Sequence, residues 1–196
     1  MEHAASSQLF ESLESYQCRQ FAKPGTPTPF EQIPDEDWRR FFDVNVLSGV
    51  RLARAFLPGM KRRDWGRIIF ISSESAIQIP AEMIHYGMTK TAQIAVARGL
   101  AESLAGTRIT VNSVLPGPTK SRGVDDFVES MAQAQNKTFT QIEKEFFEHV
   151  RPTSLLKRFI TPQEVGSFVA YVASPLAAAT SGAALRVDGG VVKSAF

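Results

Sequence analysis

A tyrosine and a lysine four positions apart are the residues of this sequence that most directly suggest chemistry. Tyr86 and Lys90 lie in the stretch HYGMTK, at the start of a segment with a helical pattern. Positions i and i+4 of a helix face the same way, about 5–6 Å apart. A nearby ammonium favours the phenolate, which helps a tyrosine, with a reference pKa of about 10, to exchange protons. The pair therefore predicts proton transfer to a carbonyl or an alcohol, although Y-x-x-x-K also occurs by chance on solvated helix faces.

Two further polar residues stand where such chemistry would need them. Ser73 follows the apolar run RIIFIS, and functional groups of parallel α/β folds commonly follow a strand. Its hydroxyl either bonds a substrate oxygen or satisfies backbone groups at the strand end. Asn45 interrupts the apolar stripe of a predicted helix, where an amide costs stability unless it is hydrogen-bonded. Asn45 therefore either holds a helix kink beside Gly49 or anchors a water that carries protons.

The elements that must position these residues alternate between strands and helices. Helices are predicted over residues 35–57, 83–105 and 162–173, and strands over residues 67–72, 108–115 and 184–190. Pro58 and Gly59 predict the end of the first helix, and Thr161-Pro162 predicts the start of the last one. Residues 123–150 add two amphipathic segments. This order predicts an α/β fold with a parallel sheet, of which three strands are visible.

Composition narrows the class of protein. Of the 196 residues, 43% are hydrophobic and 21% are charged, which suits one domain with a sizeable core and argues against global disorder. A net charge of +2 without a basic block offers nucleic acid no electrostatic footprint. No apolar run approaches the roughly 20 residues that span a bilayer, and the N-terminus lacks a secretory signal. The single cysteine, Cys18, fits a reducing compartment. We therefore expect a cytoplasmic protein without nucleic-acid or membrane partners.

Together the motifs resemble the short-chain dehydrogenase/reductase family. Ser73 precedes Tyr86 by 13 positions (86 − 73 = 13), the spacing typical of the family, and YGMTK fits its Y-x-x-x-K. FDVNVLS is similar to the helix motif that carries the family's active-site asparagine, and VNSVLPGPT to the strand and Pro-Gly turn beside the nicotinamide. Residues 158–190 match the C-terminal helix-loop-strand pattern. The resemblance runs from about Pro29 to Val192.

The resemblance implies a role for each residue that matches. Hydride would move between NAD or NADP and a small alcohol or ketone, while Tyr86 exchanges a proton with the substrate oxygen. Lys90 would lower the pKa of Tyr86 and hold the nicotinamide ribose, and Ser73 would orient the substrate oxygen. Asn45 would support a proton-relay water through its main chain. The implied cofactor contacts, with no metal among them, are Tyr86, Lys90, Pro116, Gly117 and Thr119.

The resemblance also divides the chain into parts. Residues 1–28 form an atypical N-terminal segment, and residues 29–196 form the family-like catalytic portion, with residues 120–150 as a substrate lid. Four lid residues are candidates for lining the substrate pocket, with ordinary core packing as the alternative for each: Phe127, Met131, Phe146 and Phe147. His85 adjoins the tyrosine but faces elsewhere on a helix, so we expect it to be structural.

One family feature has no counterpart in the sequence. Family members begin with a strand and a glycine-rich turn, T-G-x-x-x-G-x-G, that admits the cofactor pyrophosphate. Here the first glycine is Gly25 and the next is Gly49. The implied fold is therefore a partial Rossmann-like, doubly wound parallel sheet that retains its C-terminal half and leaves RIIFIS as a bare edge.

Three hypotheses about function stay open at this point. The first is an NAD(P)-dependent oxidoreductase of the family type, although the sequence does not show how this chain would hold the pyrophosphate. The second is a non-catalytic remnant that folds through oligomer contacts. The third is a truncated or frame-shifted product. The resemblance further implies a homodimer or homotetramer, in which the helices near 35–57 and 83–105 pair across a dimer.

Overall fold

The computed structural model describes residues 29–195, apart from the side chains at positions 122, 123 and 127. They belong to two compact units. The sheet unit comprises residues 29–116 and 169–186, and the helical unit comprises residues 117–168 and 187–195. The atypical segment 1–28 lies outside the described residues. Each unit is built around elements that the sequence pattern predicts.

The sheet unit is built on a three-stranded parallel sheet, which confirms the predicted fold class. The strands follow the order β1-β2-β3, with β1 (Gly66–Ile71), β2 (Ile109–Pro116) and β3 (Ala184–Val187). β1 and β2 pair in register from Gly66 opposite Ile109 to Ile71 opposite Val114. Every residue of β2 is buried, as expected for the central strand of a covered parallel sheet. Among the described strands, β1 lies at one edge.

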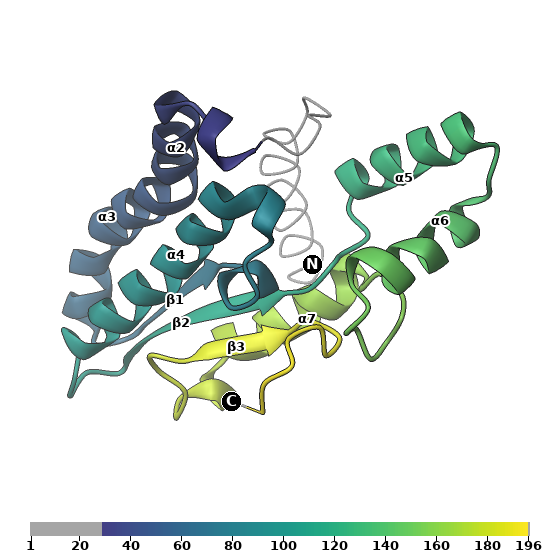
Figure 1. The fold of residues 1–196 in the computed structure, drawn as a ribbon. Coiled ribbons are helices and arrows are strands. Elements are labelled where there is room, and N and C mark those ends of the chain that lie inside the picture. Colours follow the sequence, from purple (N-terminus) through teal and green to yellow (C-terminus); the bar gives the residue numbers. More distant parts are fainter. Residues whose placement is uncertain (1–28, 196) are drawn as a thin grey trace. The chain divides into compact units, whose positions relative to one another are not determined.

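Helices cover one face of β1 and β2 in the sheet unit (Figure 1). α3 (Ser48–Arg63) packs against β1, α4 (Ile84–Glu102) packs against both strands, and α2 (Asp35–Phe42) packs against α4. The short segments of the unit are η1 (Phe30–Gln32), η2 (Asp43–Leu47), η3 (Glu74–Ala76), η4 (Ala81–Met83) and η6 (Pro175–Ala177). Side chains from α4, from the turn that follows it and from the two strands form the buried core: Phe70, Ala97, Leu104, Ile109 and Val111. Burial of each large apolar side chain contributes about 1.5–3 kcal/mol, which holds the helices on the sheet.

The first long helix does not end where the sequence predicts. Helix α3 continues through Pro58 to Arg63, so the predicted end at Pro58-Gly59 is wrong. Leu57 and Met60 pack against the core, and their burial offsets the backbone hydrogen bond that proline removes. The helix ends at Asp64, which adopts a left-handed φ of 46°, a conformation that aspartate tolerates. The π-helical segment η2, which separates α2 from α3, also interrupts the predicted helix.

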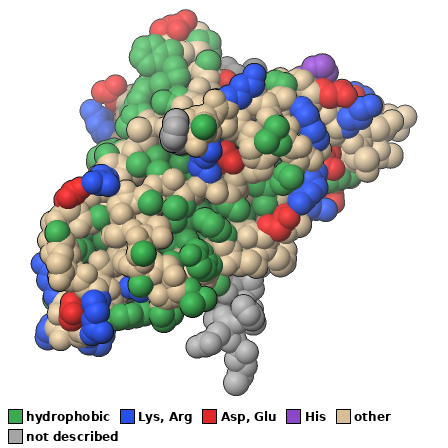
Figure 2. Space-filling view, turned by 90° about the horizontal axis from the view of Figure 1, so that it is seen from below, with side chains coloured by type: hydrophobic (Ala, Val, Ile, Leu, Met, Phe, Trp, Pro, Cys, Tyr) green, Lys and Arg blue, Asp and Glu red, His purple; other side chains and the backbone are tan. Residues whose placement is uncertain are grey.

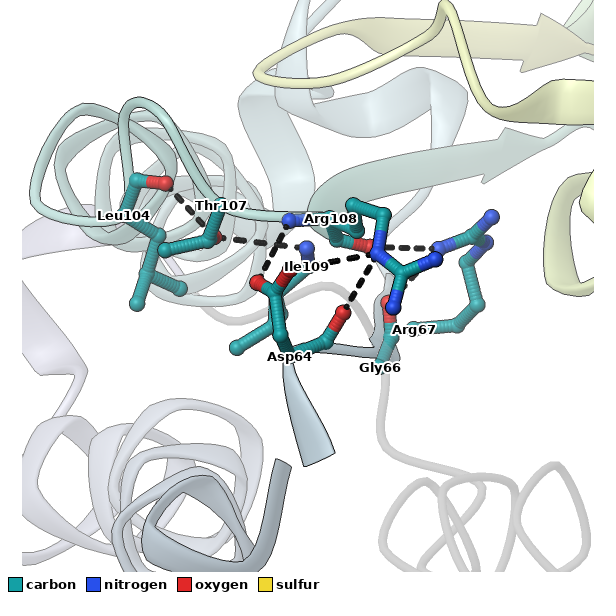
Figure 3. Close-up of polar contacts among 7 residues, drawn as sticks. All are labelled: Asp64, Gly66, Arg67, Leu104, Thr107, Arg108 and Ile109. Atoms are coloured by element: carbon teal, nitrogen blue, oxygen red, sulfur yellow. Dashed lines mark hydrogen bonds and ion pairs between the residues drawn. The ribbon is translucent and has the colours of Figure 1, made fainter. Parts of the chain in front are cut away.

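A polar network fastens the N-terminal ends of β1 and β2 to each other (Figure 3). The Asp64 carboxylate accepts hydrogen bonds from the backbone N–H and the Nε of Arg108, both at 3.1 Å. Arg67 Nη1 donates to the carbonyls of Gly66, at 2.9 Å, and of Arg108, at 3.1 Å. The bond from the Arg108 backbone, followed by that from its side chain, lowers the pKa of Asp64. The network therefore ties the end of α3 to the start of both strands.

The helical unit contains the two amphipathic segments predicted within residues 123–150. They form α5 (Arg122–Gln135) and α6 (Phe139–Glu145), which is continued by η5 (Phe146–Val150). Asn136, with a left-handed φ of 52°, and a capping box at Thr138 separate the two helices. The unit has its own core of Val128, Ala132, Ile142, Phe147 and Phe159, against which Met131 and Phe146 are partly buried. Phe147 therefore packs in a core, and the Phe127 side chain lies outside the described atoms.

Helix α7 (Pro162–Ala173) begins where Thr161-Pro162 predicts. Thr161 Oγ1 accepts from the Glu164 N–H at 3.2 Å, and the Glu164 carboxylate accepts from the Thr161 N–H at 2.8 Å, so the two residues form a capping box. Hydrogen bonds from Arg158 and then Thr161 lower the pKa of Glu164 to about 2. The last strand ends at Val187 and not at residue 190, because the chain turns through Gly189 and Gly190 with positive φ angles.

The surface carries charges of both signs. On the face shown in Figure 2, basic and acidic side chains lie interspersed among apolar ones. Large apolar side chains stay exposed on α3, where Leu52 and Phe56 have exposed fractions of 58% and 64%. Within residues 29–195, no helix is both long enough and apolar enough to span a membrane.

Candidate active site

The four predicted catalytic residues all belong to the sheet unit. Tyr86 and Lys90 lie on α4, Ser73 lies just beyond the carboxyl end of β1, and Asn45 lies in η2. Helix α4 packs against η2, η3 and β1, so it joins the elements that carry the other residues. The carboxyl end of a parallel sheet is where such folds gather functional groups. The structure therefore assembles one region from positions that are far apart in the sequence.

Lys90 is the most deeply buried charged residue of this region, with an exposed fraction of 0%. Its Nζ donates a hydrogen bond to the Ile71 carbonyl at 3.1 Å and lies 5.5 Å from the centroid of the Tyr86 ring. The predicted proximity of the two side chains is thus confirmed. Burial of an ammonium costs free energy, which polar partners such as the Ile71 carbonyl offset. The catalytic role of the pair stays a prediction.

Two serines at the end of β1 have different partners. The Ser72 hydroxyl donates to the Lys90 carbonyl at 2.8 Å, and its N–H donates to Val114, which extends the strand pairing. Ser72 is therefore structural. The half-buried Ser73 hydroxyl oxygen accepts from the Ser75 N–H at 3.1 Å and so caps η3. Because a hydroxyl can accept and donate at once, this cap leaves Ser73 able to donate to a substrate oxygen.

The start of α4 is held against η3. A Cβ on Gly87 would lie 3.1 Å from the Ser75 carbonyl oxygen and 2.6 Å from the Ile79 side chain, so a larger residue would force the two elements apart. Thr91 Oγ1 donates to the Ala76 carbonyl at 2.8 Å. Since Tyr86 precedes Gly87 and Ser73 precedes η3, these contacts bring the surroundings of the two predicted catalytic residues together.

Asn45 is hydrogen-bonded through both its side chain and its main chain. Its Nδ2 donates to Thr89 Oγ1 at 2.9 Å, and that hydroxyl donates to the Tyr86 carbonyl at 2.7 Å. Its carbonyl oxygen accepts from Gln93 Nε2 at 2.7 Å. The sequence interpretation missed Thr89 and Gln93, although they follow Tyr86 by three and seven positions and so share its helix face. Polar residues at those positions were the available signal.

His85 packs against α2, in agreement with the expected structural role. Its ring centroid lies 4.5 Å from that of Phe41 and 5.8 Å from that of Trp38. Phe41 also contacts Tyr86, with ring centroids 6.3 Å apart. The buried Nδ1 of His85 has no hydrogen-bond partner among the described residues, and burial lowers the pKa of the imidazole.

The residues predicted to contact the nicotinamide divide between the two units. Pro116 ends β2 in the sheet unit, whereas Gly117 and Thr119 open the helical unit. A Cβ on Gly117 would lie 2.5 Å from the Asp188 carbonyl oxygen, so this backbone contact requires glycine. Thr119 Oγ1 donates to the Gly117 carbonyl at 2.8 Å. The turn is thus tightly built, and its contact with a cofactor stays a prediction.

The described residues fit one end of a dinucleotide cofactor. The Lys90 ammonium and the Tyr86 phenol offer donors suited to ribose hydroxyls. A pyrophosphate needs glycines that let a backbone approach it at a helix N-terminus. Within residues 29–195, no glycines follow the T-G-x-x-x-G-x-G spacing. Among the described residues, the donors that would suit a dinucleotide are therefore those that would face its nicotinamide end, and their contact with a cofactor stays a prediction.

Comparisons with known proteins bear on the family and the fold of the chain. A family model described as Enoyl-(Acyl carrier protein) reductase matches residues 18–192. The uncharacterized oxidoreductase YvaG of Bacillus subtilis is 47% identical over 170 residues, which cover 87% of this chain and 64% of YvaG. D-beta-hydroxybutyrate dehydrogenase of Cupriavidus necator is 31% identical, over 83% of this chain and 62% of that protein.

A solved structure of L-sorbose reductase from Gluconobacter frateurii, in complex with NADPH and L-sorbose, resembles this fold with a TM-score of 0.79 and 27% identity. The matched region covers 87% of this chain and 64% of the reductase. The fold and the Tyr-Lys helix beside a buried strand define a Rossmann-like α/β protein. More narrowly, the chain belongs to the short-chain dehydrogenase/reductase family. It spans somewhat less than two thirds of the length of the curated relatives that it matches.

Proposed function

We propose that this chain contributes the proton-transfer site of an NAD- or NADP-dependent oxidoreductase that interconverts an alcohol and a ketone. The observation that carries the proposal is the wholly buried Lys90, whose Nζ lies 5.5 Å from the Tyr86 ring centroid. Folding retains a desolvated ammonium in that place despite its cost, and groups held against such a cost commonly serve function. When bound, the nicotinamide supplies or accepts the hydride.

The chain's own residues then carry out the proton transfer. In the direction of reduction, the Tyr86 hydroxyl gives its proton to the substrate oxygen, and the phenolate that remains is stabilised by the Lys90 ammonium. In the direction of oxidation, the same phenolate takes the proton back. Ser73 donates a hydrogen bond to the substrate oxygen and so fixes its position. The Asn45 carbonyl binds a water that restores the proton to Tyr86.

The proposed substrate, cofactor contacts and oligomeric state rest on the similarity to the relatives. The names of two of them refer to D-beta-hydroxybutyrate and L-sorbose, so we propose a small polar alcohol or ketone as the substrate. Pro116, Gly117 and Thr119 contact the nicotinamide, and residues 120–150 act as a substrate lid. The protein is a cytoplasmic homodimer or homotetramer, with the exposed Leu52 and Phe56 of α3 at a subunit contact.

A second candidate is a non-catalytic, oligomer-forming protein. The observation that favours it is the lack, within residues 29–195, of a glycine-rich turn for the pyrophosphate. Under this view the protein still self-associates, but it binds neither NADH nor NADPH. Size-exclusion chromatography with light scattering, read beside cofactor binding, separates the two candidates.

The decisive experiment is a thermal-shift titration with NADH and NADPH at millimolar concentration. A cofactor at a hundredfold excess over its dissociation constant stabilises the fold by about 2.7 kcal/mol, and each kcal/mol raises Tm by about 2–4 °C for a chain of this size. Lys90→Met is the matched control and should abolish the shift. Turnover is then followed by nicotinamide absorbance with D-beta-hydroxybutyrate and L-sorbose. A wild-type protein that shows neither a shift nor turnover refutes the proposal.

A further inference from the structure

A continuous line of buried hydrogen bonds runs from Gln93 to the main chain of Tyr86. Gln93 Nε2 donates to the Asn45 carbonyl at 2.7 Å, Asn45 Nδ2 donates to Thr89 Oγ1 at 2.9 Å, and Thr89 Oγ1 donates to the Tyr86 carbonyl at 2.7 Å. All of these groups belong to the sheet unit. Gln93 thus bonds the same carbonyl to which the proposed function assigns the relay water.

The orientation of the Gln93 amide follows from its partner. The Asn45 carbonyl oxygen can only accept, so the amide nitrogen of Gln93 must face it and the amide oxygen must face away. That oxygen, Oε1, is buried and has no hydrogen-bond partner among the described residues, and the whole side chain has an exposed fraction of only 5%. A buried amide oxygen without a partner is costly. Ordered water commonly satisfies such groups in protein interiors.

We propose that Gln93 is a positioning residue of the proton path, which fixes the Asn45 carbonyl through its Nε2 and holds a buried water at its Oε1. The inference rests on the proposed function for the role of the Asn45 carbonyl. A carbonyl oxygen has two lone pairs, and the Gln93 amide takes one of them, so in the proposed path the relay water takes the other, in a direction that the amide fixes. Gln93 lies three residues beyond Lys90 on α4, close to one helical turn, so the water at Oε1 gives the path a second fixed point on the same helix.

Only an amide of this length meets both demands. Gln93→Met keeps the length and removes both the donor and the acceptor. Gln93→Glu keeps the shape but places a carboxylate oxygen against the Asn45 carbonyl, which repels it until the carboxyl is protonated and can donate. The exposed Gln78, which lies outside the helices and strands, gives the matched control Gln78→Met.

Two readouts need no cofactor. A high-resolution crystal structure of the wild-type protein should show a water within hydrogen-bond distance of Gln93 Oε1, and Gln93→Met should lack it. Urea unfolding should show a roughly ten- to hundredfold smaller folding equilibrium constant for Gln93→Met, because the Asn45 carbonyl loses its donor, and no change for Gln78→Met. Gln93→Glu should approach wild-type stability as the pH falls and its carboxyl is protonated.

A third readout separates positioning from plain stability. Gln93→Met should lower kcat about tenfold, leave the KM for NADPH unchanged and alter the pH profile of kcat, whereas protonated Gln93→Glu should recover activity at low pH. A crystal structure with no water at Oε1, an unchanged stability of Gln93→Met, or an unchanged kcat in an active enzyme would each overturn the inference. Failure of the proposed function is distinct, because it appears as a wild-type protein without cofactor binding or turnover.

Discussion

The Nζ of Lys90 reaches the carbonyl oxygen of Ile71 at 3.1 Å and so joins the middle of α4 to the last residue of β1. The whole Lys90 side chain is buried, with an exposed fraction of 0%. The site therefore selects for a narrow side chain with one terminal cation. A planar guanidinium is broader and cannot be neutralised by losing its proton.

The stability of Lys90 variants should depend more on the size of the new side chain than on its charge. For Lys90→Met, loss of the bond to Ile71 opposes relief from burying a cation, so the unfolding free energy should change by less than about 2 kcal/mol. Lys90→Arg should be destabilised by about 1–3 kcal/mol more, through overpacking. Urea unfolding of the two variants measures which of them has the lower unfolding free energy. An arginine variant at least as stable as the methionine variant would contradict this account.

Gly117 should tolerate no side chain, because its Cβ would lie 2.5 Å from the Asp188 carbonyl oxygen. We expect Gly117→Ala to destabilise the protein by about 1–3 kcal/mol, since backbone must move. Gly166→Ala on α7 is the matched control, because no atom lies within 4 Å of its added Cβ. That variant should gain about 0.5–1 kcal/mol from helix propensity. Thermal unfolding of both compares them directly, and equal effects would refute the close contact.

The Asp64 carboxylate should make stability depend on pH in the acid range. Its pKa is lowered in the folded protein, chiefly by the hydrogen bond from the Arg108 N–H, so the unfolded chain binds a proton more readily. The stabilisation is therefore present above the ordinary aspartate pKa and is lost as the pH falls through the folded one. Asp64→Asn keeps a residue that tolerates the left-handed backbone. The gap in unfolding free energy between wild type and variant should shrink on acidification, and a gap independent of pH would argue against the ion pair.

His85 should contribute a second pH dependence, closer to neutrality. Burial lowers its pKa, with Asp37 opposing this shift and Arg40 adding to it. The unfolded chain therefore binds the proton more readily, so stability falls as the pH drops through the ordinary histidine pKa toward the folded one. His85→Phe keeps the ring packing on Phe41 and removes the unpaired Nδ1.

The His85→Phe variant should be more stable than the wild type, by a margin that grows as the pH is lowered from 8 to 5. His149→Phe, at an exposed position of η5, controls for the loss of an imidazole elsewhere. Chemical denaturation at each pH provides the measurement. A margin that narrows on acidification would show that the His85 imidazole is stabilised in its charged form.

Local patterns in the sequence predict the parts of the structure that depend on neighbouring residues. The approach of Lys90 to Tyr86 follows from helical spacing, and the start of α7 follows from Thr161 as the N-cap with Pro162 after it. The end of α3 was missed because burial of Leu57 and Met60 against the core outweighs the local effect of Pro58. Tertiary packing had the larger free energy there.

The hydrogen-bond partners of Asn45 could not be predicted from local sequence patterns, for a different reason. Its partners Thr89 and Gln93 lie 44 and 48 residues further along the chain, so only the packing of α4 on η2 reveals them. The choice between a structural amide and a proton-path residue could not be made from the stripe that Asn45 interrupts. In the structure its amide and its carbonyl are both hydrogen-bonded, and its part in a proton path stays a prediction.

The register of the sheet has a consequence for the order in which the chain can fold. Gly66 pairs with Ile109, 43 residues later (109 − 66 = 43). Pairing of β1 with β2 therefore requires the closure of a long loop, which costs chain entropy and slows this step of folding. The bonds from Lys90 to Ile71 and from Ser72 to Lys90 span only 19 and 18 residues and need no part of β2. During synthesis from the N-terminus, α4 can therefore dock on β1 before the second strand has emerged. The buried lysine of the candidate site thus makes contacts that become available to the nascent chain before any strand pairing does.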